Sequence, residues 1–233
     1  MILYICIVNR STMEFDKIYN KGQAQLFKNN YLEYLTKTHP IVIWSMYLPV
    51  LILLPYYSFR TIGFDGMSVF LLSLSGAFFW SFTEYILHRF VFHFHPTSER
   101  GKKINYILHG NHHEYPRDKE RLFMPAVPSL IIASFFFGIF YLVLREKAFA
   151  FFPGFLFGYL IYGSMHYAIH AWNPPFKWMK GLWRNHHLHH YKHVDKGFGV
   201  SSTLWDHIFG TMFDLKNEKE DKEKVKELMF QKK

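Results

Sequence analysis

Long apolar runs separated by polar, basic stretches are the feature that most restricts how this chain can fold. Each run is long enough to cross a bilayer as one helix. In hydrocarbon only helices and closed barrels satisfy every backbone amide, so runs of this length favour helices. The sequence therefore predicts an all-α integral membrane protein with four transmembrane helices, at about Ile41–Phe59, Gly66–Leu87, Ala126–Leu144 and Ala148–His166.

The basic residues lie unevenly between these runs. The formal charge is +9 with histidine neutral, and the segment 88–125 alone holds seven lysines and arginines. The basic residues of the two short connections are only Arg60, Arg145 and Lys147. Cytoplasmic connections carry an excess of such residues. We therefore expect 88–125, 171–215 and both termini to be cytoplasmic, at a bacterial inner membrane or the endoplasmic reticulum. Anionic lipid explains this charge better than nucleic acid does.

Three regions follow from this pattern. Residues 1–40 are a mixed, partly charged cytoplasmic lead-in that is compatible with an interfacial helix, residues 41–215 form the four-span domain, and residues 216–233 form a charged C-terminal tail. Gly, Ser and Ala recur in the second run, which predicts close helix packing. Glu84 is unusual at membrane depth, and we expect it to face protein or a metal region.

The fifteen histidines are concentrated where the predicted spans end. Several have i, i+3, i+4 spacing, which places side chains on one helix face. Ten belong to four such places: His88 and His93; His109, His112 and His113; His166 and His170; and His186, His189 and His190.

Neutral imidazole is a common ligand of iron, zinc and copper. Ten imidazoles exceed the three or four ligands of a zinc site. They suit two metals with about five ligands each and a position left for dioxygen. We therefore predict a cytoplasmic histidine-rich helical cap that holds a di-metal site. Iron fits a site that must be reduced and bind dioxygen, and spacing alone does not distinguish it from zinc. The lone cysteine, Cys6, excludes a Cys-based metal site.

The remaining histidines are expected to be structural or solvated. These are His39, His95, His193 and His207. His187 lies beside His186 but does not fit the i, i+3, i+4 set. We predict no catalytic residue beyond the metal ligands.

Four stretches resemble the fatty acid hydroxylase superfamily, which also holds sterol desaturases. They are EYILHRFVFH from Glu84, LHGNHHEYPRDKERLFMP from Leu108, GYLIYGSMHYAIH from Gly158, and HHLHHYKHVDKGFGVSSTLWDHIFGT from His186. In the last, the Gly-Phe-Gly-Val-Ser-Ser that follows the histidines is similar to the fatty acid 2-hydroxylase branch.

The resemblance implies the same ten histidines as metal ligands. It also implies dioxygen as co-substrate and hydroxylation of a long acyl chain, in a fatty acid or sphingolipid, at the carbon beside its carboxyl or amide. Some relatives carry a fused cytochrome b5 domain with a His-Pro-Gly-Gly motif. His39-Pro40 and His95-Pro96 lack those glycines. A separate electron-donor protein, cytochrome b5-like or ferredoxin-like, is therefore expected.

The sequence departs from the family pattern at two positions. Gly163 follows Tyr162 where an aspartate is usual, and Ala171 stands where a histidine is frequent. We expect a hydrogen bond behind the ligands to be lost or replaced. Some aromatic residues of the spans are candidates for the lining of an acyl channel, with plain lipid or helix contact as the alternative for each: Phe78, Phe79, Trp80, Phe155, Phe157 and Tyr159.

Two alternatives remain open. A desaturase or a hydroxylase of sterols or carotenoids would use the same histidines, because desaturation and hydroxylation share the first hydrogen abstraction. The second alternative is a non-catalytic membrane metal-binding or transport protein, and transport needs polar residues buried within the spans. The spans hold almost none away from their histidine-bearing ends, which disfavours a transport pathway.

Overall fold

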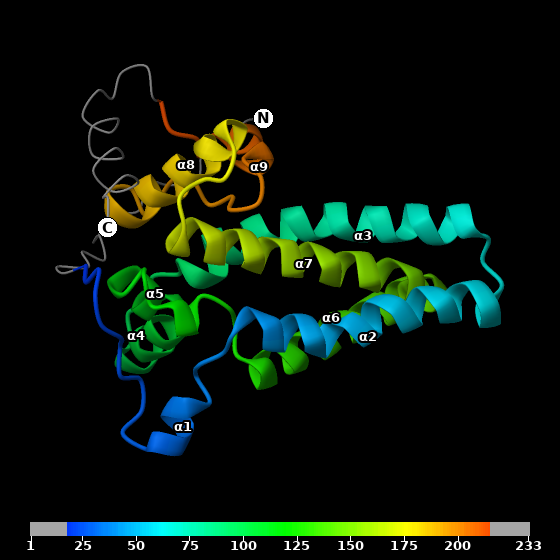
Figure 1. Cartoon of the computed structure of the whole chain (residues 1–233), viewed down its shortest axis with the longest axis horizontal. Coiled ribbons are helices and arrows are strands. Elements are labelled where there is room, and N and C mark those ends of the chain that lie inside the picture. The colour runs from blue at the N-terminus through cyan, green and yellow to red at the C-terminus, as the bar shows by residue number, and fades with distance from the viewer. Residues whose placement is uncertain (1–17, 215–233) are drawn as a thin grey trace.

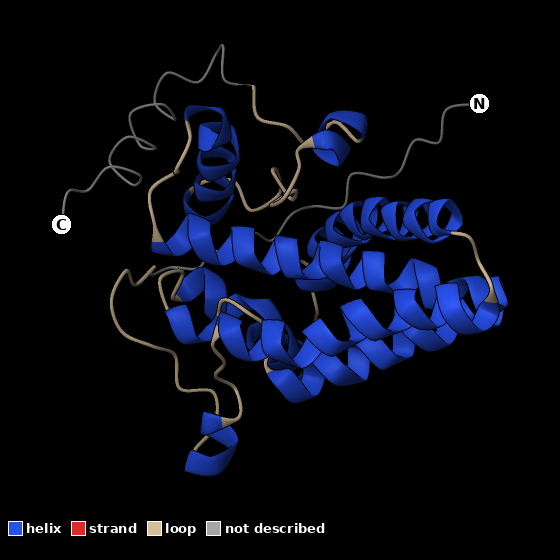
Figure 2. Ribbon diagram, turned by 45° about the vertical axis from the view of Figure 1, so that its right-hand side comes forward, coloured by secondary structure: helices blue, strands red, loops and turns tan. Residues whose placement is uncertain are grey.

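The computed structural model describes residues 18–214, and this part of the chain contains helices and no strand (Figure 2). The start of the predicted lead-in and the predicted tail, 216–233, lie outside the described residues. The α-helices are α1 (Asn30–Tyr34), α2 (Pro40–Tyr57), α3 (Gly66–Ile86), α4 (Glu99–Asn105), α5 (Asn111–Glu114), α6 (Ala126–Leu144), α7 (Ala148–Ala171), α8 (Lys180–Tyr191) and α9 (Leu204–Ile208).

Four long helices, α2, α3, α6 and α7, lie alongside one another (Figure 1). By length and composition, three segments could cross a membrane: Pro40–Ile62, Gly66–Phe92 and Lys119–Ala171. The third, of 53 residues, includes both α6 and α7, which are joined by a single 3-10 turn at Arg145–Lys147. The predicted all-helical architecture is confirmed for residues 18–214, which include helices long and apolar enough to cross a membrane, while the number of crossings stays a prediction.

The most extensive contact in the bundle is between α3 and α7. A Cβ atom on Gly154 would lie 1.7 Å from the carbonyl oxygen of Ser73, and one on Gly76 would lie 2.1 Å from that of Phe151. The Ser73 hydroxyl donates a hydrogen bond to the Ala150 carbonyl across the same crossing, at 2.8 Å. Small residues thus allow two backbones to touch, which is how helices associate in lipid.

A cap covers one end of the four long helices. It consists of α4, α5, α8, α9 and their connections, at the end where α3 and α7 finish (Figure 1). The lead-in from residue 18 is attached to this cap, because Arg121 pairs with Glu33 of the lead-in. Arg121 also pairs with Asp118, three residues before it, at 2.6 Å. Within the lead-in, α1 is only five residues long and exposes Tyr31 and Tyr34.

Candidate metal centre

π-helical turns place the first histidines. The segment Leu87–Phe92 continues α3 as a π-helix, and His93 donates its backbone N–H to the His88 carbonyl at 3.2 Å. An i→i+5 hydrogen bond makes residues five apart neighbours on one face. Another π-helical turn, Tyr106–Gly110, contains His109 and continues directly into α5. The spacing of His88 and His93, which does not fit an α-helix, is thereby explained.

The structure brings all ten predicted histidines together in two groups of five. In each group, one ring nitrogen per histidine lies within 4.8 Å of the others. Residues from every predicted place contribute: His88, His93, His109, His113 and His189 form the first group, and His112, His166, His170, His186 and His190 form the second.

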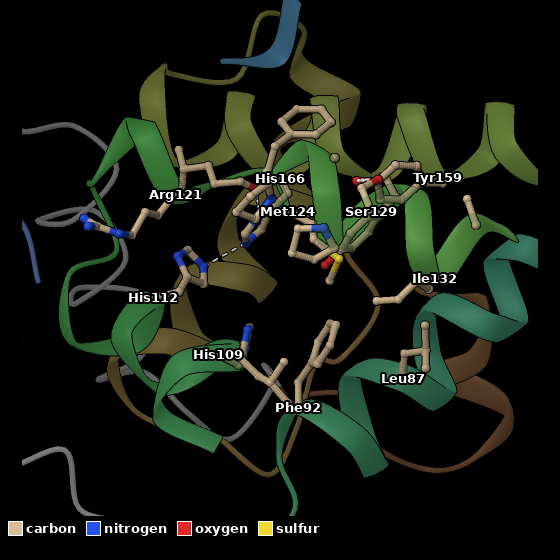
Figure 3. A pocket seen from close by; sticks show the side chains of 18 of the residues that line it. Leu87, Phe92, His109, His112, Arg121, Met124, Ser129, Ile132, Tyr159 and His166 are labelled. Atoms are coloured by element: carbon tan, nitrogen blue, oxygen red, sulfur yellow. Dashed lines mark hydrogen bonds between the residues drawn. The ribbon is translucent and has the colours of Figure 1, made fainter. Parts of the chain in front are cut away.

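The Nε2 atoms converge at spacings suited to a metal ion. In the first group, the Nε2–Nε2 distance is 3.0 Å for both His113–His109 and His189–His93. In the second group it is 2.8 Å for His166–His112 (dashed in Figure 3) and 2.9 Å for His170–His186. Ligands at about 2.1 Å from one ion and 90° apart would be about 3.0 Å from each other. The groups therefore have the donor spacing of a metal site.

Burial keeps these imidazoles neutral. Desolvation, followed by neighbouring histidines, lowers the pKa of His109, His112 and His190 well below its ordinary value. Desolvation also lowers the pKa of His189, to about 4. A neutral imidazole retains the lone pair that binds a metal.

Several buried ring nitrogens have no hydrogen-bond partner among the described residues. They include Nε2 of His88 and both ring nitrogens of His190. Burying an unpaired polar group is costly, and a bound cation would offset that cost. The residues present therefore fit a metal centre.

Backbone carbonyls orient three of the rings from behind. The Nδ1 atoms of His88, His166 and His189 lie 2.5, 3.0 and 2.8 Å from the carbonyl oxygens of Phe198, Leu122 and Lys196, respectively. An Nδ1–H that donates to a carbonyl fixes the tautomer and leaves the Nε2 lone pair for a metal.

Glu84 holds the loop that supplies two of these carbonyls. Its carboxylate is buried and accepts hydrogen bonds from the backbone N–H groups of Val200 (2.7 Å) and Ser201 (2.9 Å), and from the Ser201 hydroxyl. The expectation that Glu84 faces protein is confirmed, and its function as the anchor of residues 196–202 was not predicted.

Asp206 holds the same loop from the other side. It accepts from the backbone N–H groups of Phe198 (2.9 Å) and Gly199 (2.8 Å). Gly197 has a φ of +68°, and a Cβ on Gly199 would lie 2.0 Å from the Ser202 carbonyl oxygen. The Gly-Phe-Gly sequence is thus required by the backbone of this loop. An acidic residue near a glycine-rich segment was the available sequence signal for Asp206.

The two departures from the family pattern have different surroundings. A Cβ on Gly163 would lie 2.3 Å from the Phe123 ring, so Phe123 fills the space beside this position. Nδ1 of His166 makes its hydrogen bond to the Leu122 carbonyl instead of to a side chain. The predicted replacement of a hydrogen bond by another is consistent with this contact. Ala171 is the last residue of α7.

The other histidines lie outside both groups. His39 caps α2 by accepting from the Ile41 N–H at 3.2 Å, and His95 and His207 are exposed. His187 hydrogen-bonds through Nδ1 to the Trp183 carbonyl at 2.6 Å. His193 also belongs to neither group. The spacing predicted that His186 and not His187 belongs to the set of ten, and the two groups agree with that prediction.

A cavity of about 560 Å³ leads from the histidines into the helical bundle. His109, His112 and His166 lie at one end, and apolar side chains such as Leu87, Phe92 and Ile132 surround it (Figure 3). Of the predicted channel residues, the lining includes Trp80, Phe155 and Tyr159. It does not include Phe78, Phe79 and Phe157, whose side chains are between 41% and 58% exposed.

Comparison with known proteins identifies the family. The sequence model described as "Fatty acid hydroxylase" matches residues 73–211, which hold all ten histidines of the two groups. This chain belongs to the fatty acid hydroxylase family.

Several named members of the family align with most of this chain. The ceramide very long chain fatty acid hydroxylase SCS7 of Saccharomyces cerevisiae is 40% identical over 83% of this chain. The dihydroceramide fatty acyl 2-hydroxylase FAH1 of Arabidopsis thaliana is 35% identical over 84% of it, and the fatty acid 2-hydroxylase of Mus musculus is 32% identical over 81%. The chain spans 50%, 82% and 56% of these relatives, respectively.

A solved structure shares the fold. It is that of full-length scs7p, with only the hydroxylase domain visible, and it is 38% identical to this chain with a TM-score of 0.76. The match covers 83% of this chain and 73% of that one. The family resemblance stated from the sequence is confirmed.

Proposed function

We propose that this fatty acid hydroxylase family member inserts oxygen at carbon 2 of long acyl chains, in fatty acids or sphingolipids. The observation that carries the proposal is the position of the two five-histidine groups at the end of an apolar cavity, which three of the histidines line. The relatives support the acyl substrate, since their names specify ceramide, dihydroceramide and fatty acid hydroxylation.

The ten histidines are proposed to hold two metal ions, five ligands to each. When bound, the metals supply dioxygen activation, the step that organic side chains do not perform. Iron is proposed because the centre must change oxidation state, which zinc does not. No further side chain is proposed to react.

The protein positions the substrate and excludes water. The apolar cavity holds the alkyl chain so that carbon 2 lies beside the histidines, and this replaces a random encounter by a fixed approach. The carbonyls of Leu122, Lys196 and Phe198 keep three ligand rings in orientation. In the net reaction a C–H bond becomes C–OH, the second oxygen atom leaves as water, and two electrons and two protons are consumed.

The electrons are proposed to come from a separate carrier protein of the cytochrome b5 or ferredoxin kind. The segment 88–125, with its seven lysines and arginines, belongs to the cap side of the molecule. Such a basic surface suits an acidic carrier, since charge complementarity speeds encounter.

Four membrane crossings, by α2, α3, α6 and α7, are proposed for the domain 41–215. The 19 residues of α6 and 24 of α7 extend about 28 and 36 Å at 1.5 Å per residue, enough for one crossing each. With four crossings, the lead-in 1–40, the cap and the tail 216–233 share one side, proposed to be cytoplasmic from its basic residues.

Lipid analysis of a host that lacks 2-hydroxy lipids tests the reaction. Expression should produce 2-hydroxy acyl chains in the hydrolysed total lipids, and the purified protein should contain about two metal ions per chain. New double bonds or hydroxysterols without 2-hydroxy acids would favour the sibling enzymes. Bound metal without any lipid product would favour a metal-binding protein.

A further inference from the structure

The two ends of the cavity differ in chemistry. Near the histidines the lining includes the polar residues Thr36, Asn111 and Arg121. The guanidinium of Arg121 is paired with the carboxylates of Asp118 and Glu33. Farther into the bundle the lining is apolar apart from the hydroxyls of Tyr47, Ser129 and Tyr159, which are hydrogen-bonded to one another. A lipid that enters this cavity therefore keeps its polar headgroup near the cap and directs its alkyl tail into the bundle.

Aromatic rings close the deep end. Along α6 and α7, the lining residues farthest from the histidine end are Phe136 and Phe155, and their ring centroids are 5.1 Å apart. Phe140 lies beyond them, 4.9 Å from Phe155 and 6.0 Å from Phe136. Phe152 adds a fourth ring, 6.3 Å from Phe155. These four residues, Phe136, Phe140, Phe152 and Phe155, are named the aromatic plug.

The plug is a packed part of the core. Phe140, Phe152 and Phe155 are all less than 9% exposed and belong to one apolar cluster with Leu156 and Leu160. Side chains in such a cluster sit close to native packing density and yield little to an incoming group. An alkyl chain that reaches Phe155 is therefore stopped there.

The position of the aromatic plug on α7 gives the length of alkyl chain that the cavity can hold. Phe155 precedes His166 by 11 positions on α7, which corresponds to about 16 Å at 1.5 Å per residue. Carbon–carbon bonds of about 1.5 Å at tetrahedral angles advance an extended alkyl chain by about 1.25 Å per carbon. About 13 carbons thus fit between the histidines and the plug.

We propose that the aromatic plug sets the upper length of the acyl chain that this enzyme hydroxylates, at about 14 to 16 carbons in all. The inference rests on the proposed function and adds a specificity determinant to it. Phe155 and Phe136 contact the end of the tail and limit its length, far from the reacting carbon.

The test supplies a host with an equimolar mixture of saturated fatty acids of 12 to 24 carbons. The 2-hydroxy acids released from total lipids are then measured by chain length. For the unchanged protein, product should fall beyond 16 carbons, by roughly tenfold for each further pair of carbons. Phe155→Ala should raise the ratio of 20-carbon to 16-carbon product by about tenfold or more.

Two further variants keep the test decisive if Phe155→Ala does not fold. Phe155→Leu removes the ring but retains an apolar side chain, and should give a smaller shift in the same direction. Ala133 lines the cavity on α6, one turn nearer the histidines than Phe136. Ala133→Phe should shorten the preferred acyl chain. Partial unfolding of the protein would not produce that shift.

Phe135→Ala and Phe157→Ala are the matched controls. Both residues are phenylalanines adjacent or close to plug residues on the same helices, are 64% and 45% exposed, and do not line the cavity. Their product profiles should equal that of the unchanged protein. Equal hydroxylation of 16- and 24-carbon chains, unaltered by Phe155→Leu and Ala133→Phe, would overturn the plug and indicate that the tail leaves sideways between helices. Absence of any 2-hydroxy acid would instead contradict the proposed function.

Discussion

At the scale of single residues, the histidines divide by what their two nitrogens do. In His88 and His189, Nδ1 is bonded to a backbone carbonyl and Nε2 points into a five-histidine group. His187 uses Nδ1 for the Trp183 carbonyl and belongs to neither group. His186, which is adjacent to His187 on α8, belongs to the second group, because a step of one residue turns a helical side chain by about 100°.

Loss of a single ligand should remove the activity. We expect His112→Ala and His189→Ala to lower 2-hydroxy acid formation by more than about 100-fold, since each deletes a donor from one group. Metal analysis of the purified variants should show fewer bound ions. His39→Ala and His207→Ala are the controls and should keep both product and metal; full activity in either ligand variant would contradict the assignment.

Glu84 should be required for stability of the cap. In Glu84→Ala the N–H groups of Val200 and Ser201 lose their buried acceptor, at about 1–3 kcal/mol each. The melting temperature in detergent should fall markedly. Glu99→Ala removes an exposed carboxylate that pairs with Lys102, and should leave the melting temperature unchanged. Equal melting temperatures for both variants would show that the Glu84 contacts are dispensable.

At the scale of elements, the crossing of α3 and α7 positions the site. These two helices carry Glu84, His88, His166 and His170 toward the cap, so their separation sets how far apart the histidine groups lie. Glycines at the crossing permit backbone contact. The predicted close packing of the second span, made from its small residues, is confirmed.

A side chain at this crossing should separate the helices. Gly154→Val would place methyl groups on the Ser73 backbone, and we expect destabilisation of about 3 kcal/mol or more, because backbone cannot move aside as a side chain can. Size-exclusion chromatography in detergent should show little folded protein. Gly138 on α6 has no atom within 4 Å of its Cβ position, so Gly138→Val should elute as the unchanged protein does. Normal elution of Gly154→Val would refute the tight crossing.

At the scale of the whole molecule, the cap collects buried neutral histidines at one end of the helices. Desolvation lowers the pKa of His187 and His189 to about 4. In the unfolded chain the pKa of a histidine is about 6.5. Between these values the unfolded state binds more protons than the folded state, so stability is complete above pH 6.5 and decreases as the pH falls toward 4.

Acid should therefore unfold the protein from the cap. Each such histidine lowers the free energy of unfolding by about 1.4 kcal/mol per pH unit below 6.5. The melting temperature should be lower at pH 5 than at pH 7.5. Chelation at pH 7.5 should also lower it, because a ligand bound only by the folded state stabilises that state. A melting temperature that rises on acidification would contradict this account.

The sequence by itself determined the helical class, the membrane character and the choice of ten histidines among fifteen. These properties depend on local patterns: the length of apolar runs, and spacings of three and four that survive in any helix. The family resemblance likewise depended on contiguous stretches, above all Gly-Phe-Gly-Val-Ser-Ser, whose glycines are required by one loop.

Only the tertiary structure decided how the ten histidines divide into two groups and which backbone carbonyls hydrogen-bond to their rings. The groups mix histidines from distant segments, such as His88 with His189, because the fold brings the π-helical segment Leu87–Phe92 beside α8. The anchors Glu84 and Asp206 and the inward set of aromatic residues follow from the same packing. Neighbours across 100 residues are fixed by which helix faces meet, and a single sequence does not encode that pairing in any local spacing.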